Sequence, residues 1–183
     1  MFCCRGNGPT TVLMPVIRHV LPVLKPLAST PPSVEWAISP LDPAAIPESL
    51  EPLVAAWNAL QEAGPRLSLA GITGDLAGRA GRTARGFVAQ RVLSAASEEL
   101  DSALEAECLG LAVLIEAHGS QGRRFSIATL LVRPDMRRRG IAAALVLHAL
   151  AHVRSCGGTE VCVETLSGWP AAAAFWRRFT TDA

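Results

Sequence analysis

Hydrophobic and polar positions follow clear periods in the second half of the chain. An unbroken apolar run predicts a buried strand, strict alternation predicts a half-covered strand, and apolar residues every three to four positions predict a helix. These patterns predict strands at 109–117, 125–132 and 159–166 and helices at 141–154 and 170–179. A turn at 118–122 makes the first two strands a hairpin, and the order hairpin, crossover helix, strand predicts a mixed α/β sheet.

The first half of the chain is less regular. Asp42-Pro43 is a helix-start signal, and Gly64-Pro65 is a stop signal. The predicted elements are a strand at 34–39, a helix at 42–63, a flexible glycine-rich connection at 64–86, a strand or a helix at 87–95, and an acidic exposed helix at 97–107.

The N-terminal 33 residues differ in composition from the rest. No acidic residue precedes Glu35, and an apolar, helix-like stretch covers 12–24. We therefore divide the chain into an N-terminal extension or accessory helix at 1–33 and a folded domain at 34–183. A basic, acid-free start is also compatible with an organelle transit peptide or a mis-assigned start codon, although prolines interrupt the helical pattern.

Composition narrows the classes of function. Half of the 183 residues are hydrophobic and 18% are charged, which is typical of a globular domain. A formal net charge of +1 argues against general binding to nucleic acid, and no apolar run reaches the roughly 20 residues that cross a membrane. Five cysteines without a CxxC pair favour a reducing compartment, so we expect a cytoplasmic protein.

The segment 130–142 is the strongest candidate site. Its sequence predicts a strand, a tight turn and then a helix, with Arg137, Arg138 and Arg139 placed before Gly140. Backbone N–H groups at a helix start have no intrahelical partner and bind anions, and glycine lets a ligand approach the main chain. The segment therefore predicts a phosphate-bearing ligand that is held mainly by main-chain groups.

This segment resembles the cofactor motif of the GNAT superfamily of acyl-CoA-dependent N-acyltransferases, Arg/Gln-x-x-Gly-x-Gly/Ala. The motif occupies 137–142 here, and the usual Val-x-Pro-Asp/Glu precedes it at 132–135. The resemblance implies a mostly antiparallel central sheet, flanked by helices and splayed at a cleft that binds acetyl-CoA. The implied cofactor-binding residues are Leu130, Leu131 and Val132 beside the pantetheine arm and Arg137, Arg138, Arg139, Gly140, Ile141 and Ala142 around the pyrophosphate.

Two positions depart from the family pattern. Trp169 and Trp176 replace an Asn before the last helix and a Tyr within it, the residue that commonly protonates the departing thiolate in relatives. The chain has no tyrosine and indole is too weak an acid, so water, Cys162 or another group has to serve. Glu164 and Glu116, on the strands after and before the motif, are the candidate proton acceptors.

GNAT domains usually add two strands after this last helix, whereas only residues 180–183 remain here. The strand at 159–166 would then have an open edge, which proteins normally cover. We expect the N-terminal extension or a second subunit in a homodimer to cover it. The alternative is a truncated or frameshifted gene product.

Two other motifs are weaker. Residues 76–83, LAGRAGRT, resemble a P-loop but lack its first glycine and its lysine, so nucleotide binding is not expected. His148 and His152 have the spacing of two zinc ligands on a helix, but no third ligand is apparent, so no metal is expected.

Together with the resemblance, the sequence predicts an N-acetyltransferase that transfers an acetyl group from acetyl-CoA to a primary amine of a small molecule or peptide. The alternatives are a catalytically impaired acyl-CoA-binding or regulatory domain, and a protein–protein module that kept the fold without the ligand. No nucleic acid or membrane partner is expected.

Overall fold

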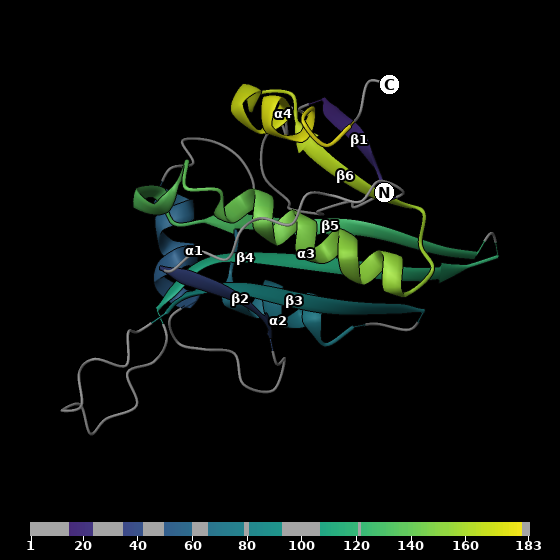
Figure 1. Cartoon of the computed structure of the whole chain (residues 1–183), viewed down its shortest axis with the longest axis horizontal. Coiled ribbons are helices and arrows are strands. Elements are labelled where there is room, and N and C mark those ends of the chain that lie inside the picture. Colours follow the sequence, from purple (N-terminus) through teal and green to yellow (C-terminus); the bar gives the residue numbers. More distant parts are fainter. Residues whose placement is uncertain are drawn as a thin grey trace, which may run out of the picture.

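The computed structural model describes residues 15–23, 35–41, 50–59, 66–78, 81–92, 107–120 and 122–180. Within these ranges six strands form one sheet in the order β1-β6-β5-β4-β3-β2 (Figure 1). The strands are β1 (Val16–Pro22), β2 (Trp36–Leu41), β3 (Arg82–Arg91), β4 (Cys108–Gly119), β5 (Gly122–Val132) and β6 (Glu160–Leu166). The helices are α1 (Leu50–Ala59), α2 (Leu69–Leu76), α3 (Ile141–Ser155) and α4 (Pro170–Trp176), with a short 3-10 helix, η1 (Pro134–Met136).

The sheet is mixed and mostly antiparallel, which confirms the predicted fold class. Consecutive strands from β2 to β5 pair antiparallel with one another along the chain. Helix α3 then crosses over to β6, which runs parallel to β5, and β1 pairs antiparallel with β6. The predicted hairpin, crossover helix and last strand are therefore all present.

Two hydrophobic cores lie on the two faces of the sheet. Helix α3 covers one face, and α1 and α2 cover the other (Figure 1). Strand β4 lies between them and alternates its side chains: Ala112 and Leu114 join the α3 core, while Leu111 and Val113 join the other. Burial on both faces explains why this strand reads as one unbroken apolar run.

Strand β1 corrects the prediction for the N-terminal extension. The apolar stretch expected as a helix at 12–24 forms a strand over the described part and pairs along its whole length with β6. Leu21 is fully buried and Val20 is 44% exposed, so the burial period is two residues. β-Branched side chains favour a strand, and Pro22, which has no N–H, is tolerated on an edge strand. The edge of β6 that was expected to be open is thus covered by β1.

The predicted flexible connection at 64–86 contains a helix and the start of a strand. The hydroxyl of Ser68 accepts a hydrogen bond from the N–H of Gly71 at 3.0 Å and so caps α2. Ile72 and Leu76 are buried in the core on this face. The glycines in this stretch obscured a short amphipathic helix whose stability comes from packing on the sheet.

Other expectations are resolved or lie outside the described residues. The ambiguous stretch at 87–95 belongs to β3 as far as Arg91. Helix α1 occupies the middle of the helix predicted at 42–63, and its flanks lie outside the described residues, as does the acidic segment at 97–107 up to residue 106. None of the helices described is both long and apolar enough to cross a membrane.

Candidate functional site

Strand β5 leaves β6 partway along its length, and this opening is the central feature of the site. The two strands share two registered pairs, Ser126 with Cys162 and Ile127 with Val163. On its other edge β5 stays paired with β4 as far as Val132. Beyond Ile127, main-chain groups on one edge of β5 therefore have no partner strand among the described residues.

A β-bulge marks the point of departure. Val113 of β4 pairs with Thr129, and Leu114 pairs with Ile127, so Ala128 is an extra residue on β5. Bulges bend a strand and increase its twist, and here the bend turns the end of β5 away from β6.

Because of the extra residue, side chains after the bulge face the opposite side of the sheet from side chains at the same parity before it. Ile127 belongs to the core under α3, whereas Leu131, at the same parity, belongs to the core under α1 and α2. Leu130 and Val132 are half-buried and pack against the α3 core. Leu130, Leu131 and Val132, the residues expected beside a pantetheine arm, therefore border the opening.

The segment after β5 folds into a tight turn that ends at the first residue of α3. Arg138 has a φ of 64° and Gly140 a φ of 83°, values that are costly for residues with a Cβ and accessible to glycine. Gly140 is the N-cap of α3 and provides no side-chain cap. The first amide with a helical acceptor is that of Ala144, 3.0 Å from the carbonyl oxygen of Gly140.

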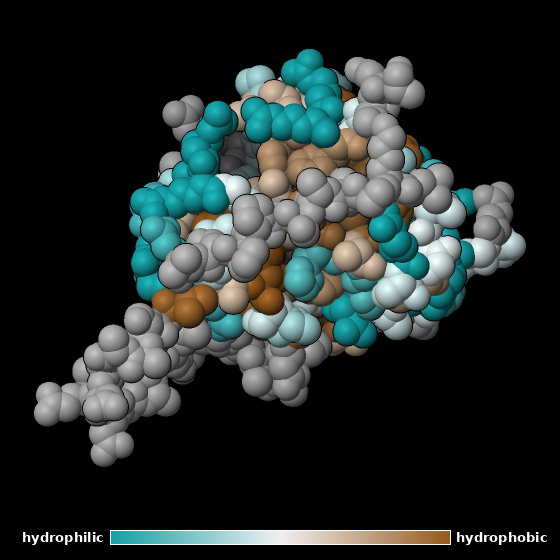
Figure 2. All heavy atoms as spheres, viewed as in Figure 1, coloured by the Kyte–Doolittle hydropathy of each residue, from teal (hydrophilic) through white to brown (hydrophobic). Residues whose placement is uncertain are grey.

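The N–H groups of residues 138–143 have no hydrogen-bond acceptor among the described residues. They lie at the positive end of the α3 dipole, where an anion is stabilised. The side chains of Arg137, Arg138 and Arg139 are exposed around them, and Arg139 pairs with Glu35 at 3.2 Å. Figure 2 shows hydrophilic residues gathered over this end of the molecule, at the left of the view. The turn suits a diphosphate in both geometry and charge.

An ion-pair network holds the base of this turn. Arg133 donates to the two carboxylate oxygens of Asp135 at 2.7 and 2.8 Å, and it also pairs with Glu107. Glu107 in turn accepts from Nε of Arg91 at 2.7 Å, which links the ends of β3 and β4 to η1. Hydrogen bonds from Arg91 and Arg133 lower the pKa of Glu107, and Arg133 lowers the pKa of Asp135.

Gly110 allows α3 to start close to the strands. A Cβ at this position would lie 2.9 Å from the carbonyl oxygen of Leu131 and 3.1 Å from side-chain carbons of Ile141 and Leu145. The first turn of α3 therefore packs directly over β4, which keeps the anion-binding turn beside the end of β5.

The two candidate proton acceptors lie at different places. Glu116 is near the β4–β5 hairpin, where its carboxylate pairs with Arg123 at 2.6 Å and with His118 at 3.2 Å. Glu164 is exposed and directly follows Val163, so it is the first residue of β6 beyond the last pair with β5. Of the two, Glu164 lies at the opening.

The two tryptophans at the unusual family positions have different surroundings. Trp176 is 5% exposed and packs with Phe175 and Phe179 in the α3 core, as expected for a core aromatic. Trp169, just before α4, meets Trp57 of α1 edge to face, with ring centroids 5.4 Å apart. The pair connects α1, which packs on β5, with the loop after β6. It therefore spans the opening on the face of the sheet that α1 covers.

The two histidines with zinc-like spacing flank an aromatic ring. His148 and His152 contact Phe87 with centroid distances of 5.6 and 6.0 Å. Burial lowers the pKa of His152, and the charge of Arg85 lowers it further. Within the described part of the chain, no three His, Cys, Asp or Glu residues cluster in a way that could hold a metal ion.

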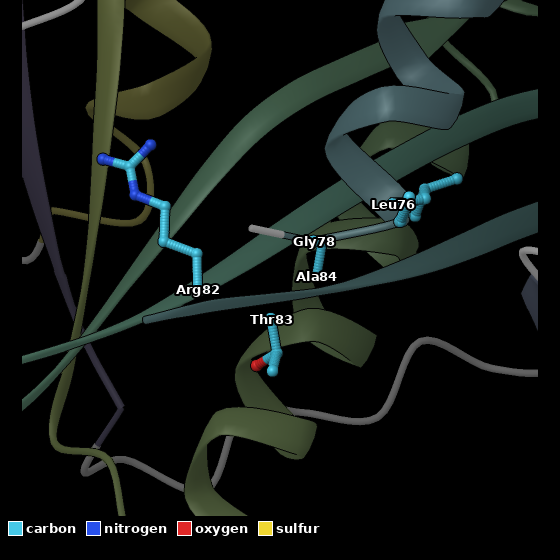
Figure 3. A pocket seen from close by; sticks show the side chains of 6 residues that line it. Leu76, Gly78, Arg82, Thr83 and Ala84 are labelled. Atoms are coloured by element: carbon cyan, nitrogen blue, oxygen red, sulfur yellow. The ribbon is translucent and has the colours of Figure 1, made fainter. Parts of the chain in front are cut away.

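A cavity of about 460 Å³ lies away from the opening, at the turn between α2 and β3 (Figure 3). Part of the P-loop-like segment lines it, including Gly78, Arg82 and Thr83. The side chains of Arg82 and Thr83 point in opposite directions, and the turn follows the C-terminal end of α2 (Figure 3). A P-loop instead converges its donors at a helix N-terminus, so this cavity lacks the geometry for phosphate binding.

Three features of the opening were missed from the sequence: the bulge at Ala128, the close approach at Gly110, and His19. His19 lies on β1 opposite Val163, is 7% exposed, and its Nε2 has no hydrogen-bond partner among the described residues. The burial of His19 follows from the pairing of β1 with β6 and has no signal in the residue pattern over 16–22. The bulge and Gly110 leave no local signal, because both depend on contacts between distant segments.

Comparison with solved structures shows the same fold. An aminoglycoside acetyltransferase from an uncultured soil metagenomic sample, in complex with sisomicin, is 17% identical with a TM-score of 0.55, over 81% of this chain and 89% of that chain. A ribosomal-protein-alanine N-acetyltransferase from Brucella melitensis biovar Abortus 2308 is 14% identical with a TM-score of 0.56, over 81% and 93%. The NatC complex bound to Gag peptide and CoA gives 19% identity and a TM-score of 0.54, over 79% and 82%. No curated protein sequence matches the chain.

The chain shares the fold of these acetyltransferase structures. The model of the acetyltransferase (GNAT) family matches residues 34–180. The chain therefore belongs to the GNAT acetyltransferase family.

Proposed function

We propose that this protein transfers an acetyl group from acetyl-CoA to a primary amine. One observation carries the proposal: the unpaired edge of β5 runs directly into the unpaired N–H groups of residues 138–143. A free strand edge suits an extended arm that contains amides, because its N–H and C=O groups can pair with the arm as with a further strand. The helix start suits a diphosphate, and coenzyme A presents these two parts in the same order.

Each predicted cofactor residue has a role in this proposal. Leu130, Leu131 and Val132 lie beside the pantetheine arm, and the turn at 137–142 binds the pyrophosphate. Because the main chain provides most of the donors, the exposed arginine side chains contribute long-range attraction rather than specific contacts.

The reaction is aminolysis of a thioester. The amine nitrogen attacks the carbonyl carbon, the carbon–sulfur bond breaks, and the sulfur leaves with the electron pair and takes up a proton. An N–H on the free edge of β5 is placed to polarise the carbonyl oxygen. We assign Glu164 as acceptor of the proton that the amine loses, because this carboxylate lies where the strands part.

The acceptor class is an amine of a small molecule or a peptide. Family membership supports acetyl transfer in general. The names of the solved relatives, which refer to aminoglycosides and to a ribosomal-protein alanine, support both kinds of amine.

An acyl-CoA-binding domain without turnover is the second candidate. One observation favours it: Trp176, at the position of the proton-donating Tyr of relatives, is buried in the core and lacks an acidic proton.

Two measurements separate these functions. Calorimetry with coenzyme A should detect binding, and thiol release from acetyl-CoA should rise with at least one member of a panel of an aminoglycoside, a polyamine and an alanine-starting peptide. Binding without thiol release would favour the binding domain. Absence of heat and of a thermal shift at millimolar coenzyme A would overturn both candidates.

A further inference from the structure

We propose that His19 supplies the proton that the departing thiolate takes up. The inference rests on the proposed function, because it assigns one step of the same reaction to a residue of the N-terminal strand.

Three polar residues are buried within the described part of the chain: Thr129 and Thr165 lie on the two strands that part, and His19 lies on β1, on the other side of β6. Thr129, on β5 just after the bulge, is 9% exposed, and Thr165, on β6 beyond its last pair with β5, is 5% exposed. His19, on β1 beside β6, is 7% exposed. His19 and Thr165 share the α3 face of the sheet, whereas Thr129 pairs with Val113 and faces the other core. Polar groups are costly to bury unless they have partners, so the two polar residues on the α3 face call for an explanation.

The ring of His19 has an unused nitrogen. Its Nε2 is buried and has no hydrogen-bond partner among the described residues. Leaving such a group unpaired costs roughly 1–3 kcal/mol, and an unpaired buried group in a native structure calls for an explanation such as a catalytic role.

The strand register places His19 level with the point where the strands part. His19 pairs with Val163, and Val163 pairs with Ile127, the residue before the bulge. Thr165 is the diagonal neighbour of His19, two residues beyond Val163 on the same strand face. Diagonal neighbours in an antiparallel pair lie about 7–8 Å apart between Cα atoms, within reach of a long side chain.

His19 also lies on the appropriate face of the sheet. His19 and Leu21 are two residues apart on β1, so their side chains lie on the same face, and His19 pairs with Val163. Leu21 and Val163 both belong to the core that contains Trp176 of α4. The family pattern implies a Tyr in the last helix, where this chain has Trp176, and this chain has a His on strand β1 on the same face. Strand β1 lies outside residues 34–180, so the family model does not include this histidine.

Protonation of the leaving thiolate needs no reactant beyond the amine, the thioester and solvent. When the carbon–sulfur bond breaks, the sulfur carries the electron pair, and the imidazolium form of His19 donates a ring proton to it, directly or through the hydroxyl of Thr165, and becomes neutral imidazole. The proton lost by the attacking amine returns the ring to its starting state through solvent. Imidazole is suited to this exchange, because it can both donate and accept a proton near neutral pH.

The first test needs no acceptor. The full chain, labelled with 15N-histidine, is titrated with coenzyme A and with desulfo-coenzyme A, in which hydrogen replaces the thiol, and the His19→Phe variant assigns the His19 signals. We expect both compounds to bind, but only coenzyme A to shift the ring nitrogen of His19. An equal response to both compounds, or no response to either, overturns the inference. Failure of both compounds to bind in calorimetry instead overturns the proposed function.

The second test separates a chemical role from a structural one. His19→Phe keeps a buried flat ring and removes the unpaired nitrogen, so its unfolding midpoint should stay level or rise. With an acceptor from the panel, kcat should fall by about 100-fold while KM for acetyl-CoA changes by less than about 3-fold. Thr165→Val should lower kcat less. His148→Phe, on exposed α3 surface, is the matched control and should change neither. An unchanged kcat, or parallel losses of stability and cofactor binding, would argue against the proton-donor role.

Discussion

Gly140 is the residue on which the shape of the anion-binding turn most directly depends. Its φ of 83° belongs to the left-handed region, and among the described residues, chain neighbours aside, no atom lies within 4 Å of a Cβ built there. The need for glycine therefore comes from the backbone conformation and from the approach of a ligand, and not from crowding by the protein itself.

Replacing Gly140 should weaken binding of coenzyme A. We expect Gly140→Ala to strain the turn by about 1–2 kcal/mol, which lowers the affinity by about 10-fold, and Gly140→Val to be more severe. Calorimetry with coenzyme A measures the loss. Gly119→Ala, at the β4–β5 hairpin with no atom near the added Cβ, should bind normally, and Arg137→Ala should be mild. Normal affinity in Gly140→Val would contradict a main-chain site.

At the level of secondary-structure elements, β1 differs most from the sequence prediction, because the segment forms a strand where a helix was expected. It is the antiparallel partner of β6 and contributes Leu21, which is 0% exposed, to the core; Val23, directly after the strand, is 1% exposed. It thereby completes a sheet whose last strand would otherwise present unpaired N–H and C=O groups.

Adjacent residues on β1 allow a matched stability test. Leu21→Ala should lower the free energy of unfolding by about 2–4 kcal/mol, because it leaves a cavity in the core. Val20→Ala, one residue away and on the exposed face, should change it by less than about 0.5 kcal/mol. Urea denaturation measures both. Equal effects at the two positions would mean that β1 does not pack in the described register.

The network that links β3, β4 and η1 should make stability depend on acid pH. Glu107 and Asp135 have pKa values in the folded protein below their ordinary values of 4.5 and 3.8. Carboxyl groups with lowered folded pKa values stabilise the protein above the ordinary values, and this contribution is lost as the pH falls through the lowered ones. The wild-type protein should therefore lose extra stability below about pH 4.5.

Arg133→Gln removes the shared partner of both carboxylates. Its unfolding midpoint should be lower than that of the wild type at neutral pH, and the difference should shrink between about pH 5 and pH 3. Arg66→Gln, at an exposed arginine outside this network, is the control and should follow the wild-type curve. A constant difference between Arg133→Gln and wild type across this range would exclude the network as the cause.

On the scale of the whole molecule, the sheet has two parts. Strands β2 to β5 carry α1 and α2 on one face and α3 on the other, and β6 with β1 carries α4. Two registered pairs between β5 and β6, the crossover helix α3 and the contact between Trp57 and Trp169 join the parts. The site lies at this junction, so it forms only when both parts are folded and packed.

Cys108 can report global unfolding. It is 2% exposed in the core on the α1 and α2 side, and burial raises the pKa of its thiol to about 11. Iodoacetamide at pH 8 should therefore modify the half-buried Cys156 and Cys162 first, and Cys108 only at the rate of unfolding. Peptide mass spectrometry measures each site, and coenzyme A should slow modification of Cys108 further by stabilising the fold. Modification of Cys108 as fast as Cys162 in the native protein would refute this account.

Local pattern was sufficient to predict the elements of the second half and the turn before α3. Periodicity at 141–154, the glycine before it and the alternation at 159–166 all reflect geometry within a few residues of chain, so they can be recognised without contacts. Strand β1 was missed because the apolar run at 12–24 suits a helix or a strand until an edge is available to pair with it.

The opening itself was decided by tertiary structure. The bulge at Ala128 exists only in the pairing of β5 with β4, the need for Gly110 only where α3 crosses β4, and the position of His19 only once β1 has paired with β6. The hydrophobic periodicity of a sequence indicates which face of a helix or strand is apolar. It does not indicate which strands pair edge to edge. Strand β1 pairs with a strand more than a hundred residues away, and the bulge and Gly110 depend on which strands and helix lie side by side. Both kinds of contact exist only in the folded molecule.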